Sequence, residues 1–191
     1  MKLEQDVNYI VSGLERSGTS MLMQILHAGD LPCEFDESRK PDINNPKGYF
    51  ELEGGKIISK LMDGSFPLEK FKGKVIKITA YGIKFLPPGK YKILYSERNM
   101  DEILDSMEKM AKIKDENREE TRQAFTGLNS MIKKQIMQRD DIDYIFVDYN
   151  EILANPEIGI KKIHEYFELP DENLENMINV VDKNLYRNRK K

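Results

Sequence analysis

Residues 7–26 constrain the fold of this chain more than any other stretch. They begin with an apolar run of strand length, pass through a short polar loop bracketed by Gly13 and Gly18, and end with apolar residues at helical spacing. Glycines let the backbone curl tightly and aim successive N–H groups inward, and the positive end of the following helix dipole attracts an anion. The stretch therefore predicts a strand, a phosphate-binding loop and a helix.

The residue after Gly18 decides which phosphate compound the loop can hold. A nucleoside-triphosphate loop has a lysine there, whereas this chain has Thr19, and the only nearby cation is Arg16. The run from Arg16 through Ser17, Gly18 and Thr19 to Ser20 resembles the 5′-phosphosulfate loop of sulfotransferases, which use 3′-phosphoadenosine 5′-phosphosulfate (PAPS). This resemblance implies that all five residues bind PAPS and that Arg16 also acts in catalysis, at the leaving 5′-phosphate.

Composition limits the remaining choices. The chain has 191 residues, of which 39% are hydrophobic and 33% charged, so we expect one globular domain spanning residues 1–191. A net charge of −3 argues against broad nucleic-acid binding. With no apolar run of membrane length and no secretory signal, we expect a cytoplasmic protein without a membrane partner. Cys33 is the only cysteine and there are two histidines, so we expect no disulfide and no metal site.

The rest of the chain alternates between strand and helix patterns. We expect strands at 73–79, 90–96 and 143–149, and helices at 56–62, 99–112, 114–139, 156–168 and 173–181. This alternation predicts an α/β protein, a three-layer P-loop fold with a central, mostly parallel sheet and helices on both faces. Such a sheet binds ligands at the carboxyl ends of its strands. The polar, irregular segment 33–55 is the natural place for contacts with an acceptor.

A second anion site is predicted after the strand at 90–96. Arg98 lies at the carboxyl edge of the sheet, and Ser106 follows two helical turns later. This spacing resembles the sulfotransferase motif that grips the 3′-phosphate of PAPS, and an arginine fork matches phosphate oxygens bidentately. The alternative is that Arg98 only pairs with Asp101 or Glu102 on the helix that follows.

The resemblance also bears on catalysis. Lys77 aligns with a strand lysine that helps to stabilise the transition state in cytosolic sulfotransferases, although an alternating strand also allows a solvent-facing lysine here. Those enzymes have a catalytic histidine two residues further on, where this chain has Thr79. Glu37, in a Glu-Ser-Arg sequence similar to the Glu-Thr-Arg of tyrosylprotein sulfotransferases, is therefore the expected general base. The alternatives are Asp36, Glu51 and Glu53.

Together these residues predict a PAPS-dependent sulfotransferase that moves a sulfuryl group to a hydroxyl or amine acceptor. The acceptor can be a small molecule, a glycan or a peptide, and neither it nor the oligomeric state follows from the sequence. The alternatives are a turn with no ligand, a P-loop nucleotide kinase-like enzyme with Asp148 as a magnesium ligand, and a catalytically inactive nucleotide-binding protein of the same fold. The basic tail at 187–191 either folds over the cofactor or is a free charged end.

Overall fold

A computed structural model describes residues 3–182 of the chain, so the basic tail at 187–191 lies outside the described residues. Within 3–182, four parallel strands form one sheet in the order β2-β1-β3-β4. The strands are β1 (Asn8–Gly13), β2 (Val75–Lys77), β3 (Tyr91–Glu97) and β4 (Ile142–Asp148). The helices are α1 (Thr19–Ala28), α2 (Ile57–Met62), α3 (Ala80–Ile83), α4 (Met100–Ala111), α5 (Arg118–Gln138), α6 (Tyr149–Ala154), α7 (Pro156–Tyr166) and α8 (Leu174–Asn179).

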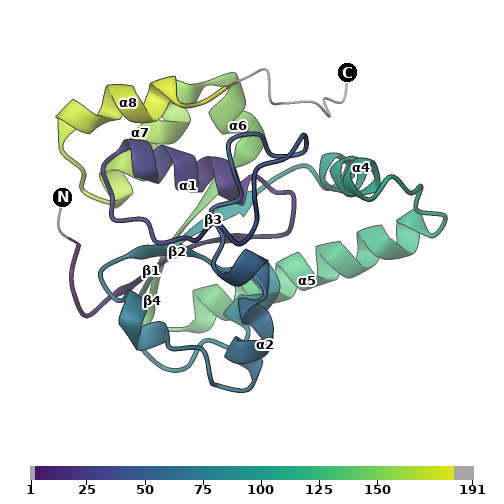
Figure 1. Ribbon diagram of the computed structural model, residues 1–191, viewed down its shortest axis with the longest axis horizontal. Helices are drawn as coiled ribbons and strands as arrows, with labels where there is room; N and C mark the ends of the chain where they lie inside the picture. Colours follow the sequence, from purple (N-terminus) through teal and green to yellow (C-terminus); the bar gives the residue numbers. More distant parts are fainter. Residues whose placement is uncertain (1–2, 183–191) are drawn as a thin grey trace.

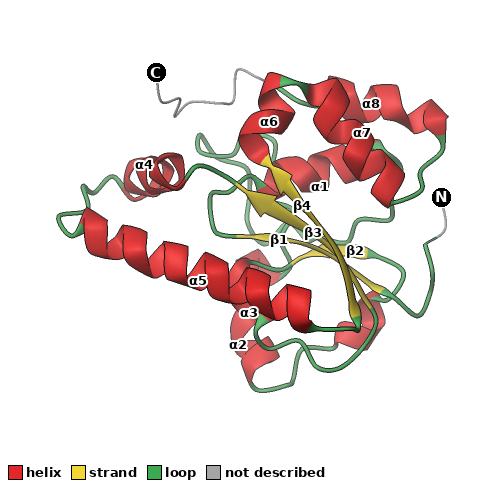
Figure 2. Cartoon of the chain, turned by 180° about the vertical axis from the view of Figure 1, so that it is seen from behind, coloured by secondary structure: helices red, strands yellow, loops and turns green. Residues whose placement is uncertain are grey.

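Helices cover both faces of the sheet. Helices α1, α6, α7 and α8 lie on one face, and α2, α3 and α5 lie on the other (Figures 1 and 2). Successive residues of a strand point to opposite faces, so Ile10 of β1 packs with Ile132 of α5 in one core while Val11 packs with Leu22 of α1 in the other. The predicted three-layer α/β fold with a parallel sheet is therefore confirmed.

The topology opens a crevice at the carboxyl ends of β1 and β3. Strand β1 has β2 on one side and β3 on the other. The chain leaves β1 into α1 on one face, and it leaves β3 through α4 into α5 on the other face. A ligand site forms outside the sheet at such a switch point. The register pairs Gly13 with Ser96, so the loop after β1 lies directly beside the residues that follow β3.

Two short helices were not expected from the sequence. Helices α3 and α6 follow closely after β2 and β4, and the strand expected at 73–79 is accordingly reduced to the three residues of β2. Four residues are too few for α3 to show helical periodicity, and its packing depends on Gly82, where a Cβ would lie 2.5 Å from the side chain of Ile78. Asp148 caps α6 by accepting two backbone hydrogen bonds, a signal that the strand pattern before it obscures.

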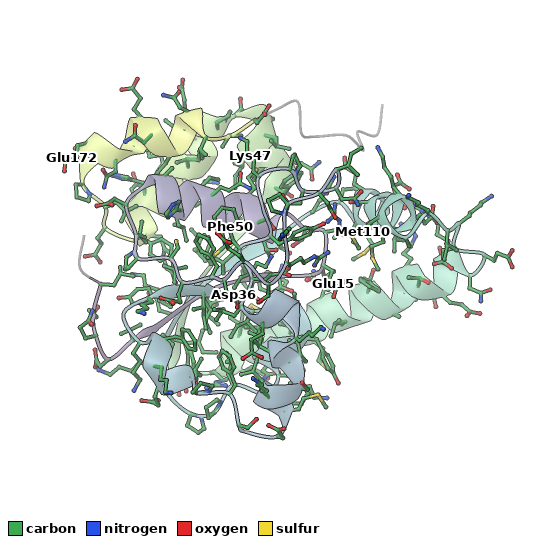
Figure 3. All side chains as sticks on the ribbon, viewed as in Figure 1. Glu15, Asp36, Lys47, Phe50, Met110 and Glu172 are labelled. Atoms are coloured by element: carbon green, nitrogen blue, oxygen red, sulfur yellow. The ribbon has the colours of Figure 1, made fainter. Side chains whose placement is uncertain are left out.

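The segment between α1 and α2 is fixed by tertiary contacts rather than by regular structure. The rings of Phe35 and Phe50 pack edge to face with their centroids 4.7 Å apart. Lys47, which is labelled with Phe50 in Figure 3, donates a hydrogen bond to the carbonyl oxygen of Val180 over 3.0 Å. These contacts hold the segment against the rest of the domain, next to the carboxyl edge of the sheet.

Candidate functional site

The loop after β1 has the conformation that a phosphate-binding turn requires. Gly18, the residue before α1, has a φ of 106°, which a side chain would strain. A Cβ there would also lie 2.2 Å from the ring of Tyr149. No atom of residues 3–182 accepts a hydrogen bond from the backbone N–H groups of Gly18, Thr19 and Ser20. These donors at the N-terminus of α1 therefore suit an anion.

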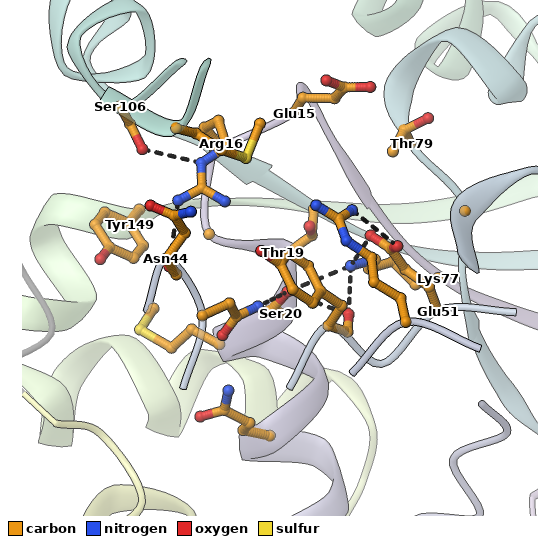
Figure 4. A pocket seen from close by; sticks show the side chains of 18 of the residues that line it. Glu15, Arg16, Thr19, Ser20, Asn44, Glu51, Lys77, Thr79, Ser106 and Tyr149 are labelled. Atoms are coloured by element: carbon orange, nitrogen blue, oxygen red, sulfur yellow. Dashed lines mark hydrogen bonds and ion pairs between the residues drawn. The ribbon is translucent and has the colours of Figure 1, made fainter. Parts of the chain in front are cut away.

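The two anion sites expected from the sequence meet at Arg16. Arg98 follows β3, and its Nη1 donates a hydrogen bond to the carbonyl oxygen of Arg16 over 2.9 Å. The Nε of Arg16 in turn donates to Oγ of Ser106 on α4 over 2.9 Å, a bond drawn in Figure 4. The phosphate loop and the pair of Arg98 and Ser106 therefore form one continuous site.

Arg98 also makes the ion pair that the alternative interpretation required. Its Nε lies 3.1 Å from Oε2 of Glu102, and both side chains are buried. Its Cζ lies 4.5 Å from the ring centroid of Tyr149. Because Arg98 lines the cleft as well, the ion pair orients its guanidinium at the site rather than drawing it away.

Lys77 reaches the same cleft from β2, and it is buried, so the interpretation of it as a solvent-facing lysine is wrong. Its Nζ lies 2.9 Å from Oε1 of Glu51, and it donates hydrogen bonds to Oγ of Ser20 and to the carbonyl oxygen of Tyr49. The other oxygen of Glu51, Oε2, accepts a hydrogen bond from Nη1 of Arg39 over 3.2 Å. Glu51 is therefore held between two cations.

The cleft concentrates positive charge. Arg16, Arg39, Lys77 and Arg98 all line it. Burial lowers the pKa of the Arg16 guanidinium from its ordinary value, and the positive charge of Arg98 acts in the same direction. Burial also lowers the pKa of the Lys77 ammonium, against the raising effect of Glu51. A bound anion would relieve these effects, because an opposite charge favours the protonated forms.

Of the four carboxylates considered as a general base, Glu51 alone lines the cleft. Glu37 is exposed and lies outside the cleft lining. The carboxylate of Asp36 accepts hydrogen bonds from the backbone N–H groups of Ser38 and Glu53. Glu53 forms an exposed ion pair. The structure therefore brings Glu51, and not Glu37, to Lys77 and the phosphate loop.

The cleft has a volume of about 410 Å³, within the range of small-molecule sites. Figure 4 shows it from close by. Ser17, alone among the residues assigned to PAPS binding, does not line the cleft; it is buried, and its Oγ has no hydrogen-bond partner within residues 3–182. The other residues assigned to PAPS binding all line the cleft: Arg16, Gly18, Thr19, Ser20, Arg98 and Ser106.

Several cleft residues were not expected from the sequence. Tyr149 comes from α6, and Arg39 and Tyr49 come from the irregular segment before α2. In the same segment, the carbonyl oxygen of Asn44 accepts from Nη2 of Arg16, and Nδ2 of Asn45 donates to Oγ of Ser20. The length and polarity of segment 33–55 were the only signals that pointed to these contacts.

The described residues provide neither a metal site nor a membrane-spanning helix. In residues 3–182, no group of His, Cys, Asp and Glu side chains is placed to hold a metal ion. No helix in this part of the chain has the length and apolar character needed to cross a membrane. The cytoplasmic location expected from the sequence stays a prediction.

The parallel sheet and the glycine loop before α1 define an α/β protein of the P-loop type. The family model of the sulfotransferase domain matches residues 6–191, so the chain belongs to the sulfotransferase family. This match confirms the resemblance and favours sulfotransferase function over the kinase-like alternative. No curated protein sequence matches the chain significantly.

Solved sulfotransferase structures share the fold. A sulfotransferase from Mycobacterium tuberculosis H37Rv matches with a TM-score of 0.58 and 14% identity, over 92% of this chain and 71% of that one. The sulfotransferase domain of the Synechococcus PCC 7002 olefin synthase matches with a TM-score of 0.51 and 14% identity, over 95% and 82%. A mouse sulfotransferase in complex with PAP matches with a TM-score of 0.50 and 15% identity, over 92% and 63%.

Proposed function

We propose that this chain is a PAPS-dependent sulfotransferase that moves a sulfuryl group to a hydroxyl or amine acceptor. The observation that carries the proposal is the contact of Arg98 with the phosphate loop at Arg16. PAPS carries one phosphate on each side of its ribose, and this contact joins two anion sites in one cleft. The mouse relative of the same fold, which was solved in complex with PAP, supports the same donor.

The groups around the phosphate loop suit the 5′-phosphosulfate. The N–H groups of Gly18, Thr19 and Ser20 have no acceptor within the described residues, and the dipole of α1 adds to their attraction for an anion. Arg98 and Ser106 would hold the 3′-phosphate with one charged fork and one hydroxyl. Arg16, which contacts both, would neutralise charge between the two phosphates.

PAPS supplies the sulfuryl group, whose bond to a 5′-phosphate oxygen breaks as a new bond forms between sulfur and the acceptor oxygen. Arg16 and Lys77 stabilise the negative charge that develops on the leaving oxygen. Glu51 accepts the proton of the acceptor hydroxyl. We choose Glu51 over Glu37 because Glu51 lines the cleft, with its carboxylate 2.9 Å from the Lys77 ammonium.

Calorimetric titration with 3′-phosphoadenosine 5′-phosphate (PAP), adenosine 5′-phosphate and ATP with magnesium tests the donor. We expect PAP to bind at least about tenfold more tightly than adenosine 5′-phosphate, because charge-assisted hydrogen bonds contribute about 1.5–3 kcal/mol each. Equal affinity for these two nucleotides would remove the assignment of Arg98 and Ser106. Tighter binding of ATP with magnesium would support the kinase-like alternative.

The assignment of the base is tested by a matched pair of variants, Glu51→Gln and Glu37→Gln. With any acceptor that the enzyme sulfates, we expect Glu51→Gln to lower kcat by about 10²-fold or more, the usual contribution of a general base. Glu37→Gln should leave kcat close to that of the wild type, because Glu37 is exposed outside the cleft. The opposite result would restore Glu37, and PAP binding without transfer to any acceptor would favour an inactive protein.

A further inference from the structure

Two tyrosines line the cleft within residues 3–182, and an arginine covers the ring of each. Cζ of Arg98 lies 4.5 Å from the ring centroid of Tyr149, and Cζ of Arg39 lies 3.5 Å from that of Tyr49. Both tyrosines are otherwise packed in the protein, with 8% of Tyr149 and 4% of Tyr49 exposed. Neither ring therefore offers a face on which a flat aromatic acceptor could stack.

Arg39 is held over its tyrosine by the candidate base. Its Nη1 donates to Oε2 of Glu51 over 3.2 Å. The hydroxyl of Tyr49, beneath the guanidinium, donates to the carboxylate of Asp42 over 2.9 Å, which fixes the ring. An acceptor that approaches Glu51 therefore meets charged and polar groups rather than an aromatic surface.

The acceptor end of the cleft lies on the side of Glu51 and Lys77. Figure 4 shows Thr79 on this side as well, with Ser106 and Tyr149 on the opposite side, where the 3′-phosphate is expected. Thr79 follows β2, the strand that carries Lys77, which explains why the two residues share one end of the site.

The cleft also offers polar groups that no other described residue uses. Glu15 and Thr79 line the cleft, and no described residue forms a hydrogen bond or ion pair with the carboxylate of Glu15 or the hydroxyl of Thr79. Gly54 and Gly55 have no side chains, which leaves the space beside Glu51 open. The non-aromatic apolar side chains that line the cleft are those of Met21, Pro46, Ile58 and Met110.

Resting on the function proposed above, we infer that the acceptor is a hydroxyl-rich, non-aromatic molecule of the saccharide class. Sugar hydroxyl groups both donate and accept hydrogen bonds, so they can bind the Glu15 carboxylate, the Thr79 hydroxyl and the Arg39 guanidinium at once. A phenol has one hydroxyl and gains most of its binding from stacking and apolar cover of its ring, and arginines already cover both tyrosine rings of the cleft.

The transfer step is balanced with such an acceptor. One sugar hydroxyl gives its proton to Glu51 while its oxygen bonds to sulfur. The sulfur–oxygen bond to the 5′-phosphate breaks, and PAP leaves with the electron pair of that bond. The remaining sugar hydroxyls hold the acceptor in place for the in-line approach that the step needs.

Sulfuryl transfer from ³⁵S-labelled PAPS to a panel of acceptors tests this inference. The panel contains glucosamine, methyl glucoside and chitin oligosaccharides on one side, and 2-naphthol and 4-nitrophenol on the other. We expect at least one saccharide to have a kcat/KM about tenfold or more above that of either phenol. A higher value for a phenol, or no transfer to any saccharide, overturns the inference. PAP affinity, measured on the same preparation, reports separately on the proposed function.

Arg39→Met, which uncovers the ring of Tyr49, tests the role of the arginine cover. We expect the ratio of phenol to saccharide kcat/KM to rise about tenfold, and the ratio cancels any general loss of activity through Glu51. Arg39→Lys keeps a cation beside Glu51 and is the matched control, in which the ratio should change less. Thr79→Val should lower saccharide kcat/KM with PAP affinity retained. An unchanged ratio in Arg39→Met together with an unchanged saccharide kcat/KM in Thr79→Val overturns the inference.

Discussion

The guanidinium of Arg98 donates a hydrogen bond to the backbone carbonyl oxygen of Arg16, 2.9 Å away. The bond joins the end of β3 to the loop after β1, and the pairing of Gly13 with Ser96 brings those two ends together. The side chain of Arg16 then extends the contact to Ser106. Substitutions in the loop after β1 and substitutions at Arg98 or Ser106 should therefore both alter the binding of the same ligand, PAP.

Ser106→Ala should weaken PAP binding by about tenfold or more, because a hydrogen bond to a charged phosphate contributes about 1.5–3 kcal/mol. The affinity for adenosine 5′-phosphate should change less, since that nucleotide lacks the 3′-phosphate. Calorimetric titration of both nucleotides measures the difference, and Ser130→Ala on the exposed side of α5 is the control. An equal loss for both nucleotides would mean that Ser106 acts through Arg16 on the 5′ side instead.

Gly18→Ala should destabilise the protein and abolish PAP binding. The φ of 106° costs a residue with a side chain about 1–3 kcal/mol, and the added Cβ would lie 2.2 Å from the ring of Tyr149. Both effects disturb the loop whose N–H groups we propose to bind the 5′-phosphosulfate. Urea unfolding and calorimetry measure the two losses.

Gly127→Ala is the matched glycine replacement. Gly127 lies inside α5, and an added Cβ there would have nothing within 4 Å. We expect this variant to raise the free energy of unfolding by about 0.5–1 kcal/mol, because alanine loses less conformational entropy in a helix. PAP affinity should stay unchanged. Comparable destabilisation of Gly18→Ala and Gly127→Ala would show that the loop geometry is not what Gly18 provides.

The phosphate loop could be predicted from sequence because its signals are local. Gly13 and Gly18 are separated by a few residues, and the strand and helix patterns on either side leave one way to connect them. The placement of Arg98 beside that loop also followed from the sequence, because parallel strands put their carboxyl ends on one edge of a sheet. The hydrogen bond between the two could not be predicted, since it depends on the register of β1 and β3.

The general base could not be chosen from sequence, because its position depends on long-range contacts rather than on local signals. Segment 33–55 has no periodicity, so nothing local says which carboxylate faces the cleft. Asp36 accepts hydrogen bonds from backbone N–H groups, whereas Glu51 forms an ion pair with Lys77, which comes from a different part of the chain. The similarity of Glu37 to a family motif is a local signal. Such a signal carries no information about the long-range ion pair that Glu51 forms with Lys77.

Cys33 should be poorly reactive in the folded protein. Burial raises the pKa of its thiol from 9.0 to about 12, and the thiolate is the reactive form. A chromogenic disulfide reagent at mildly alkaline pH should label it much more slowly than in guanidinium chloride. Because the thiol has a higher pKa in the folded than in the unfolded protein, its contribution to the free energy of unfolding is complete below pH 9.0. This contribution is lost as the pH rises from 9.0 toward about 12. Cys33→Ala should therefore lose less stability over that interval, and equal labelling rates in both states would contradict the assignment.

Lys77 should make PAP binding depend on pH. Burial lowers the pKa of its ammonium below the ordinary 10.5, and PAP binds the charged form, so affinity should fall as the pH rises through a value under 10.5. Tyr49 and Tyr149, which also line the cleft, do not add to this fall, because burial raises the pKa of both and keeps them neutral. Calorimetric titration across the alkaline range measures the effect.

Lys77→Arg separates this group from the others in the cleft. The guanidinium stays protonated throughout the range, so the affinity of this variant for PAP should be nearly constant with pH. Lys134→Arg, on the exposed side of α5, should keep the fall seen in the wild type. If affinity fell equally in Lys77→Arg, the titrating group would be another cation of the cleft, and the ion pair with Glu51 would then be the whole role of Lys77.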